Sequence, residues 1–139
     1  MKNFKEQNSL KEIKKEFNYK DPFLLEEQLY EDEILIRNTA RDFATKELLP
    51  KIIEANRNEV YDNDLFKKLG KIGLLGAQIK GYGCSGVSSV SYGLIAKEIE
   101  RVDSAYRSCF SVQSSLVMQP IFDYGSEEQK KRWLPELAK

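Results

Sequence analysis

The chain has 139 residues, of which 41% are hydrophobic, and this is enough apolar material for one sizeable core in a single domain. The charges of the 22 basic and 22 acidic side chains cancel, so the composition lacks the excess of basic residues that is typical of nucleic-acid-binding proteins. Histidine, the commonest general base and metal ligand, is absent, which argues against a self-contained hydrolase triad or a zinc site.

Residues 1–20 are rich in Lys and Glu, and we expect them to form a flexible or loosely docked tail. The helical spacing of Leu10, Ile13 and Phe17 leaves a short amphipathic helix open. The tail has no apolar signal core, and its glutamates and lack of arginine differ from a mitochondrial transit peptide. A cytoplasmic location in a bacterium is therefore the default prediction, or the mitochondrial matrix if the source is eukaryotic.

The predicted helices begin after the turn signal Asp21-Pro22. The pattern is helical from Phe23, and its apolar positions keep the spacing of one buried face: Ile36, Ala40, Phe43 and Ala44. Pro50 interrupts this helix, and residues 51–57 read as a short continuation after a kink. A further helix carrying Leu65, Phe66, Leu69 and Ile72 follows, capped by Asp62 or Asn63 and ended by Gly73.

Three glycines, Gly81, Gly83 and Gly86, form a G-x-G-x-x-G spacing in the middle of the chain. Such a loop can cradle phosphate, but no clear strand precedes it and the Gly-Lys-Ser/Thr ending of a P-loop is missing. A tight turn that needs positive φ angles is the better interpretation. The two cysteines, Cys84 and Cys109, fit no metal spacing and are expected to be reduced and structural.

The second half of the chain is predicted to hold three more helices, each with its own start signal. Ser88 or Ser89 caps the first, Asp103 and Ser104 offer a break and a new cap, and Ser126 starts the last. Pro120 is expected to end the middle helix, and Trp133 and Leu134 to lie on the inner side of the last one. No strand pattern is convincing, so the predicted fold class is all-α.

The middle helix of this half is unusual in its charge. Between Ser104 and Phe122, Arg107 is the only charged residue in a chain that is 32% charged. On a helix, Arg107, Ser111 and Ser114 fall on one stripe. This stripe has two interpretations: a seam that holds a small anion against an apolar wall, or an ordinary polar face turned to water.

Two stretches carry a family resemblance: DPFLLEEQLYEDEILIRNTARDFATKELLPKIIEANRNEV, and the region from IKGYGCSGVSSVSYG through ERVDSAYRSCFSVQSSLVMQP to WLPELAK. Together, over residues 19–139, they resemble the N-terminal helical domain of acyl-CoA dehydrogenases, and within this family the glutaryl-CoA dehydrogenases. The resemblance implies three domains, of which the β domain and the C-terminal helical bundle are missing here. Residues 21–139 are therefore expected to be the N-terminal domain of a longer protein.

The resemblance also implies roles for residues. FAD is expected to be held mainly by the missing domains, which also supply the catalytic Glu, so no catalytic or cofactor-binding residue is expected in this chain. Arg107, Ser108 and Ser111 match the residues that bind the distal carboxylate of the glutaryl group, and Glu100 matches the partner of that arginine. If the helix breaks at Asp103, Glu100 and Arg107 have to meet across the break.

The implied reaction is the oxidation and decarboxylation of glutaryl-CoA to crotonyl-CoA and carbon dioxide, as in lysine and tryptophan degradation. The implied partners are an electron-transfer flavoprotein and further copies of the chain in a homotetramer. Two alternatives stay open: a non-decarboxylating or other dicarboxylyl-CoA dehydrogenase, and a helical interaction module without catalysis.

Overall fold

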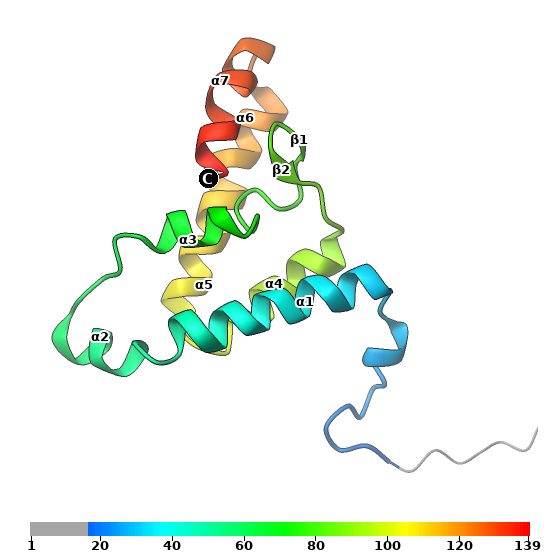
Figure 1. The fold of residues 1–139 in the computed structure, drawn as a ribbon. Helices are drawn as coiled ribbons and strands as arrows, with labels where there is room; N and C mark the ends of the chain where they lie inside the picture. The colour runs from blue at the N-terminus through cyan, green and yellow to red at the C-terminus, as the bar shows by residue number, and fades with distance from the viewer. Residues whose placement is uncertain (1–16) are drawn as a thin grey trace, which may run out of the picture.

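The computed structural model describes residues 17–139, so the predicted helix of Leu10 and Ile13, like most of the tail, lies outside the described residues. Its elements in chain order are η1 (Glu26–Gln28), α1 (Glu31–Phe43), η2 (Ala44–Leu48), α2 (Ile52–Asn58), α3 (Leu65–Lys71), β1 (Lys80–Gly81), β2 (Cys84–Ser85), α4 (Ser89–Glu100), α5 (Ser104–Ser111), η3 (Val112–Met118), α6 (Gln119–Tyr124) and α7 (Glu127–Leu137). The predicted all-α class is confirmed (Figure 1). None of the described helices has the length and apolarity that crossing a membrane requires.

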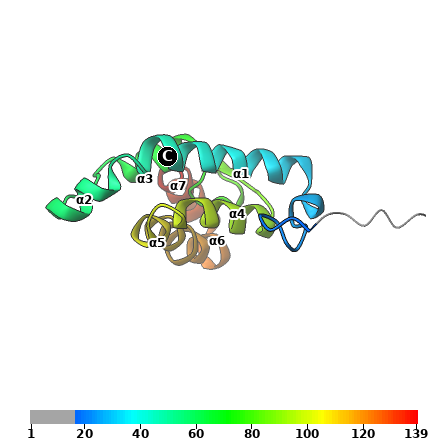
Figure 2. The ribbon, with the colours of Figure 1, turned by 90° about the horizontal axis from the view of Figure 1, so that it is seen from below.

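Helices α1 and α4 lie side by side and run in the same direction (Figures 1 and 2). Near their N-terminal ends, the buried carboxylate of Glu33 accepts a hydrogen bond of 2.9 Å from the hydroxyl of Ser88, the N-cap of α4. Near their C-terminal ends, Arg41 donates two hydrogen bonds to the buried carboxylate of Glu98. Two polar links therefore fix the register of the apolar faces that pack between these helices.

The rod of α5, η3 and α6 (residues 104–124) rises from the α1–α4 pair, and α7 packs back against its upper end (Figure 1). The prediction that Pro120 ends the helix is wrong. The segment η3 is a π-helix, and Pro120 stands in the first turn of α6, where a proline without an N–H is tolerated. The rod continues to Tyr124, and Gly125 ends it.

A two-stranded antiparallel hairpin, β1–β2, corrects the prediction that the chain has no strand. Gly81 pairs with Cys84, and the two loop residues Tyr82 and Gly83 have φ angles of 54° and 82°. Two successive positive φ angles define a type I′ turn, whose twist suits a tight hairpin. The hydroxyl of Tyr82 donates to Glu127 at 2.9 Å, so the turn is fastened to α7.

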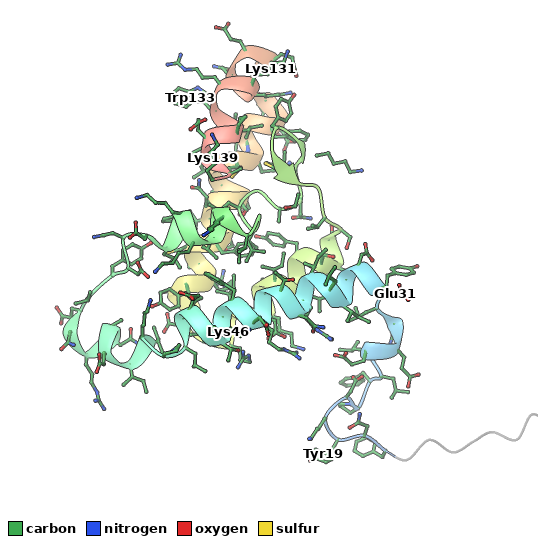
Figure 3. The ribbon with its side chains drawn as sticks, viewed as in Figure 1. Tyr19, Glu31, Lys46, Lys131, Trp133 and Lys139 are labelled. Atoms are coloured by element: carbon green, nitrogen blue, oxygen red, sulfur yellow. The ribbon has the colours of Figure 1, made fainter. Side chains whose placement is uncertain are left out.

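Three other details differ from the sequence-based expectation. Helix α1 begins at Glu31 and not at Phe23; the carboxylate of Glu33 accepts a hydrogen bond of 3.1 Å from the backbone N–H of Tyr30, which caps the helix there. Asp64, and not Asp62 or Asn63, is the N-cap position of α3. Trp133 is 46% exposed and projects from the side of α7 (Figure 3), whereas its neighbour Leu134 is fully buried.

The core lies between the rod, α4, α7, η2, α3 and the segment before the hairpin. Its fully buried large side chains are mainly aliphatic, with one aromatic ring: Phe110, Leu48, Leu65, Leu69, Leu75, Ile79, Ile95, Ile99, Met118 and Leu134. Burying such side chains is the main favourable term in folding, at about 1.5–3 kcal/mol each. This core holds the corner between α4 and α5 in place.

Candidate functional site

The candidate site is the corner between α4 and α5. The helical conformation is interrupted at Asp103, whose side chain caps α5 by accepting a hydrogen bond of 2.8 Å from the backbone N–H of Ala105. The break turns the last residue of α4, Glu100, toward the first turn of α5. As a result, Nε of Arg107 donates to Oε2 of Glu100 at 2.6 Å. The pair thus forms across the helix break.

The predicted serines surround this ion pair in different ways. The Ser111 hydroxyl accepts a hydrogen bond of 2.9 Å from Nη1 of Arg107 and donates to the backbone carbonyl of Ser108 at 3.2 Å. In the described part of the chain the Ser108 hydroxyl makes no hydrogen bond. Ser104, which sequence reasoning assigned only as a cap, donates its hydroxyl to Oε1 of Glu100 at 2.5 Å.

Charge at the corner is partly open to water. The side chain of Arg107 is 37% exposed and that of Glu100 is 44% exposed. The hydrogen bond from Ser104, followed by that from Arg107, lowers the pKa of Glu100 below its usual value. Glu100 is therefore a carboxylate at neutral pH, and Arg107 is held by one full charge and one hydroxyl.

Arg107 retains donors for a further anion. A guanidinium has five N–H groups, and only one on Nε and one on Nη1 are used by Glu100 and Ser111. Among residues 17–139, Nη2 of Arg107 has no partner. The remaining N–H groups have the fork geometry that recognises a carboxylate.

A pocket of about 350 Å³ lies beside the same helix face. Ser114, the third residue of the predicted stripe, lines it but is buried, and its hydroxyl accepts a hydrogen bond of 3.1 Å from the backbone N–H of Gly76. Ser114 is therefore part of the wall and not a free donor. Tyr92 on α4, which sequence reasoning missed, lines the pocket as well; no motif marked it.

The glycine loop of residues 81–86 does not form a phosphate cradle for a dinucleotide. Gly81 and Gly83 belong to the β1–β2 hairpin and Gly86 follows β2 directly. Ser88 accepts the hydrogen bond of the Ser91 N–H at the start of the following helix. No group of three or more Asp, Glu or Cys side chains suited to a metal ion is present in residues 17–139. What the described residues offer is a half-exposed guanidinium at the α4–α5 corner and a pocket beside the same helix face.

Comparisons with known proteins point to one family. A family model described as the acyl-CoA dehydrogenase N-terminal domain matches residues 30–139. An acyl-CoA dehydrogenase from Bacillus subtilis is 37% identical over 109 residues, which cover 78% of this chain and 29% of the relative. The mitochondrial short-chain specific acyl-CoA dehydrogenase of Mus musculus is 32% identical over 108 residues, covering 77% of this chain and 26% of the relative. The chain thus spans less than a third of these relatives.

Solved structures add a more specific likeness. A glutaryl-CoA dehydrogenase from Mycobacterium smegmatis in complex with FADH2 superimposes with a TM-score of 0.81 at 44% identity, covering 84% of this chain and 30% of that one. A structure described as the electron transferring flavoprotein of Acidaminococcus fermentans matches with a TM-score of 0.75 at 34% identity, over 79% of this chain and 29% of that one.

Proposed function

This chain belongs to the acyl-CoA dehydrogenase family as an N-terminal domain, and on that basis we propose that the full-length protein is a glutaryl-CoA dehydrogenase. The proposal rests on Arg107, whose free N–H groups lie at the α4–α5 corner between Glu100 and Ser111. An acyl chain that ends in a carboxylate would place its anion there, whereas an uncharged acyl chain would leave the guanidinium without a substrate partner. The likeness to a glutaryl-CoA dehydrogenase at 44% identity supports the same substrate.

In this proposal the domain contributes recognition and orientation. Arg107 and Ser111 hold the distal carboxylate, and Ser108, whose hydroxyl is free of other bonds in the described chain, adds a donor. The cofactor is FAD, because the Mycobacterium smegmatis relative is described in complex with FADH2. Since the glycine loop of residues 81–86 forms no dinucleotide cradle, we assign FAD and the general base to parts of the protein beyond this domain.

The proposed reaction ends with the loss of the carboxylate that Arg107 binds. Once the α,β double bond is formed, the bond to the distal carboxylate breaks and its electron pair moves into the conjugated thioester, which becomes a dienolate as carbon dioxide leaves. The general base, which holds the α-proton, returns a proton to the γ-carbon, and crotonyl-CoA is the product. A tight clamp on the anion opposes this step, because the charge that it stabilises disappears. Glu100, at 2.6 Å from Nε of Arg107, tempers the positive field at the site.

We propose an electron-transfer flavoprotein as the electron acceptor, because a chain similar to this one occurs in a structure that is described as the electron transferring flavoprotein of Acidaminococcus fermentans. We further propose that the full-length protein is a homotetramer and that the reaction serves lysine and tryptophan degradation. These assignments rest on the family resemblance.

The test is Arg107→Gln in the full-length enzyme, with glutaryl-CoA and the uncharged five-carbon valeryl-CoA as substrates. The ratio of kcat/KM for glutaryl-CoA to that for valeryl-CoA should fall about 10- to 150-fold, which corresponds to the loss of one charge-assisted hydrogen bond of about 1.5–3 kcal/mol. Arg132→Gln on exposed α7 is the matched control and should leave the ratio unchanged. Equal losses on both substrates would show that Arg107 is structural and that the proposal is wrong.

A further inference from the structure

Tyr92 lies along the helix face that carries Arg107. Its ring packs on Phe110 with the ring centroids 5.0 Å apart and the planes 30° from parallel. It lines the same pocket as Ser114. Because Arg107, Phe110 and Ser114 are spaced i, i+3 and i+7, they share one face of the rod, and Tyr92 covers that face from α4.

The Tyr92 hydroxyl is available to a ligand. Within residues 17–139 it makes no hydrogen bond, although the side chain is partly buried. Burial raises the pKa of Tyr92, and the positive charge of Arg107 lowers it only in part, so the phenol keeps its proton at neutral pH. A protonated phenol is a hydrogen-bond donor, and a donor beside a cation is suited to an anion.

The shape of the site places a limit on the ligand. Tyr92, the buried Ser114 and Gly76 are among the residues that line the pocket of about 350 Å³, and the Ser114 hydroxyl accepts a hydrogen bond of 3.1 Å from the backbone N–H of Gly76. None of these three groups can withdraw cheaply, because the ring is stacked on fully buried Phe110 and the serine is hydrogen-bonded. A short acyl chain with a terminal anion fits such a fixed wall better than a long one does.

We propose that Tyr92 is a specificity-determining residue, whose hydroxyl donates a hydrogen bond to the distal carboxylate that Arg107 and Ser111 hold. This inference rests on the proposed function and adds a residue to it. The carboxylate then receives donors from two helices, with Arg107 and Ser111 on α5 and Tyr92 on α4. Two-sided contact selects both the charge of the acyl chain and its length.

The experiment compares Tyr92→Phe with the wild type in the full-length enzyme, using glutaryl-CoA and valeryl-CoA. Phenylalanine keeps the ring on Phe110 and removes only the hydroxyl, so folding is preserved and thermal unfolding should stay within about 2 °C of the wild type. The ratio of kcat/KM for glutaryl-CoA to that for valeryl-CoA should fall about 10-fold, mainly through a higher KM for glutaryl-CoA. Tyr124→Phe, at a side chain that is 89% exposed, is the matched control and should leave the ratio unchanged.

Running Arg107→Gln in the same series separates the two proposals. If Arg107→Gln lowers the ratio and Tyr92→Phe leaves it within twofold of the wild type, the role of Tyr92 is refuted while the proposed function stands. Equal losses on both substrates in Tyr92→Phe also refute it, because they indicate a structural role. If neither variant lowers the ratio, both proposals are wrong.

Discussion

Replacing Glu98 by Gln tests how α1 and α4 are joined. The Glu98 side chain is 1% exposed. Its Oε1 accepts from Nη2 of Arg41 at 2.8 Å, and its Oε2 accepts from Nε of Arg41 at 3.1 Å and from Nε of Arg101 at 3.4 Å. The variant keeps the shape of the side chain and removes the charge that both arginines share.

The expected loss of stability is about 2 kcal/mol. Removing one partner of a fully buried ion pair costs about 3–5 kcal/mol, because the other charge is stranded without water. Here Arg41 and Arg101 are 47% and 46% exposed, so both guanidiniums can be hydrated after the change. The loss therefore approaches that of one or two charge-assisted hydrogen bonds, reduced by solvent screening. For a domain of this size, 2 kcal/mol corresponds to a melting temperature lower by about 8 °C.

The effect should depend on pH in a defined direction. Burial by itself raises the pKa of Glu98, but the hydrogen bonds and charges of Arg41 and Arg101 outweigh it, and the pKa is lowered. A carboxyl with a lowered folded-state pKa contributes stability above its unfolded-state pKa of about 4.3, and this contribution is lost as the pH falls through the folded-state value. The difference between wild type and variant should be full at pH 7 and shrink below about pH 4.

The assay is thermal and urea unfolding of the 139-residue chain, monitored by the helical circular dichroism signal at pH 7 and again below about pH 4. Asp42→Asn is the control, because its pair with Lys46 is exposed on both sides and should be worth less than about 0.5 kcal/mol. A Glu98→Gln variant within 0.5 kcal/mol of the wild type at pH 7, or a difference that acid leaves unchanged, would refute the reasoning.

Two further outcomes are expected. Glu100→Gln in the full-length enzyme should slow carbon dioxide release relative to substrate oxidation. In a single-turnover experiment the unsaturated dicarboxylyl thioester should therefore accumulate. If both steps slow together, Glu100 has only a structural role. The 139-residue chain alone should purify colourless and bind no FAD at equilibrium dialysis, since the glycine loop of residues 81–86 forms no dinucleotide cradle, and stoichiometric binding would contradict that assignment.

Local start signals were readable from the sequence. Ser88, Asp103 and Ser126 each accept a hydrogen bond from a backbone N–H at the start of the predicted helix. Such caps act over three residues and depend little on the rest of the fold. The extent of the rod was not readable, because a π-helix changes the bonding pattern that makes Pro120 a stop signal, and no residue type marks that change.

The candidate site was only partly readable from the sequence, because contacts between elements that are distant in the chain determine the rest of it. Arg107 was marked by its isolated charge, and Glu100 followed from the family resemblance. The structure brings the two together through the break at Asp103, while their role in binding stays a proposal. The stripe predicted that Ser114 resembles Ser111, but Ser114 is tied to Gly76, which is 38 residues away in the chain. Tyr92 reaches the site by the packing of α4 on α5, and single-helix periodicity gives no information about such contacts.

The parallel pairing of α1 and α4 has a consequence for how the chain folds. Its two polar links join residues 55 and 57 positions apart, so the intervening segment must close into one long loop before either link can form. Closing this loop costs conformational entropy, which is offset only once α1 has packed on α4. The contacts among α4, α5 and the helices after them join residues that are close in sequence, so they form at a lower entropic cost. We therefore expect the C-terminal half to collapse first and the docking of α1 to limit the rate.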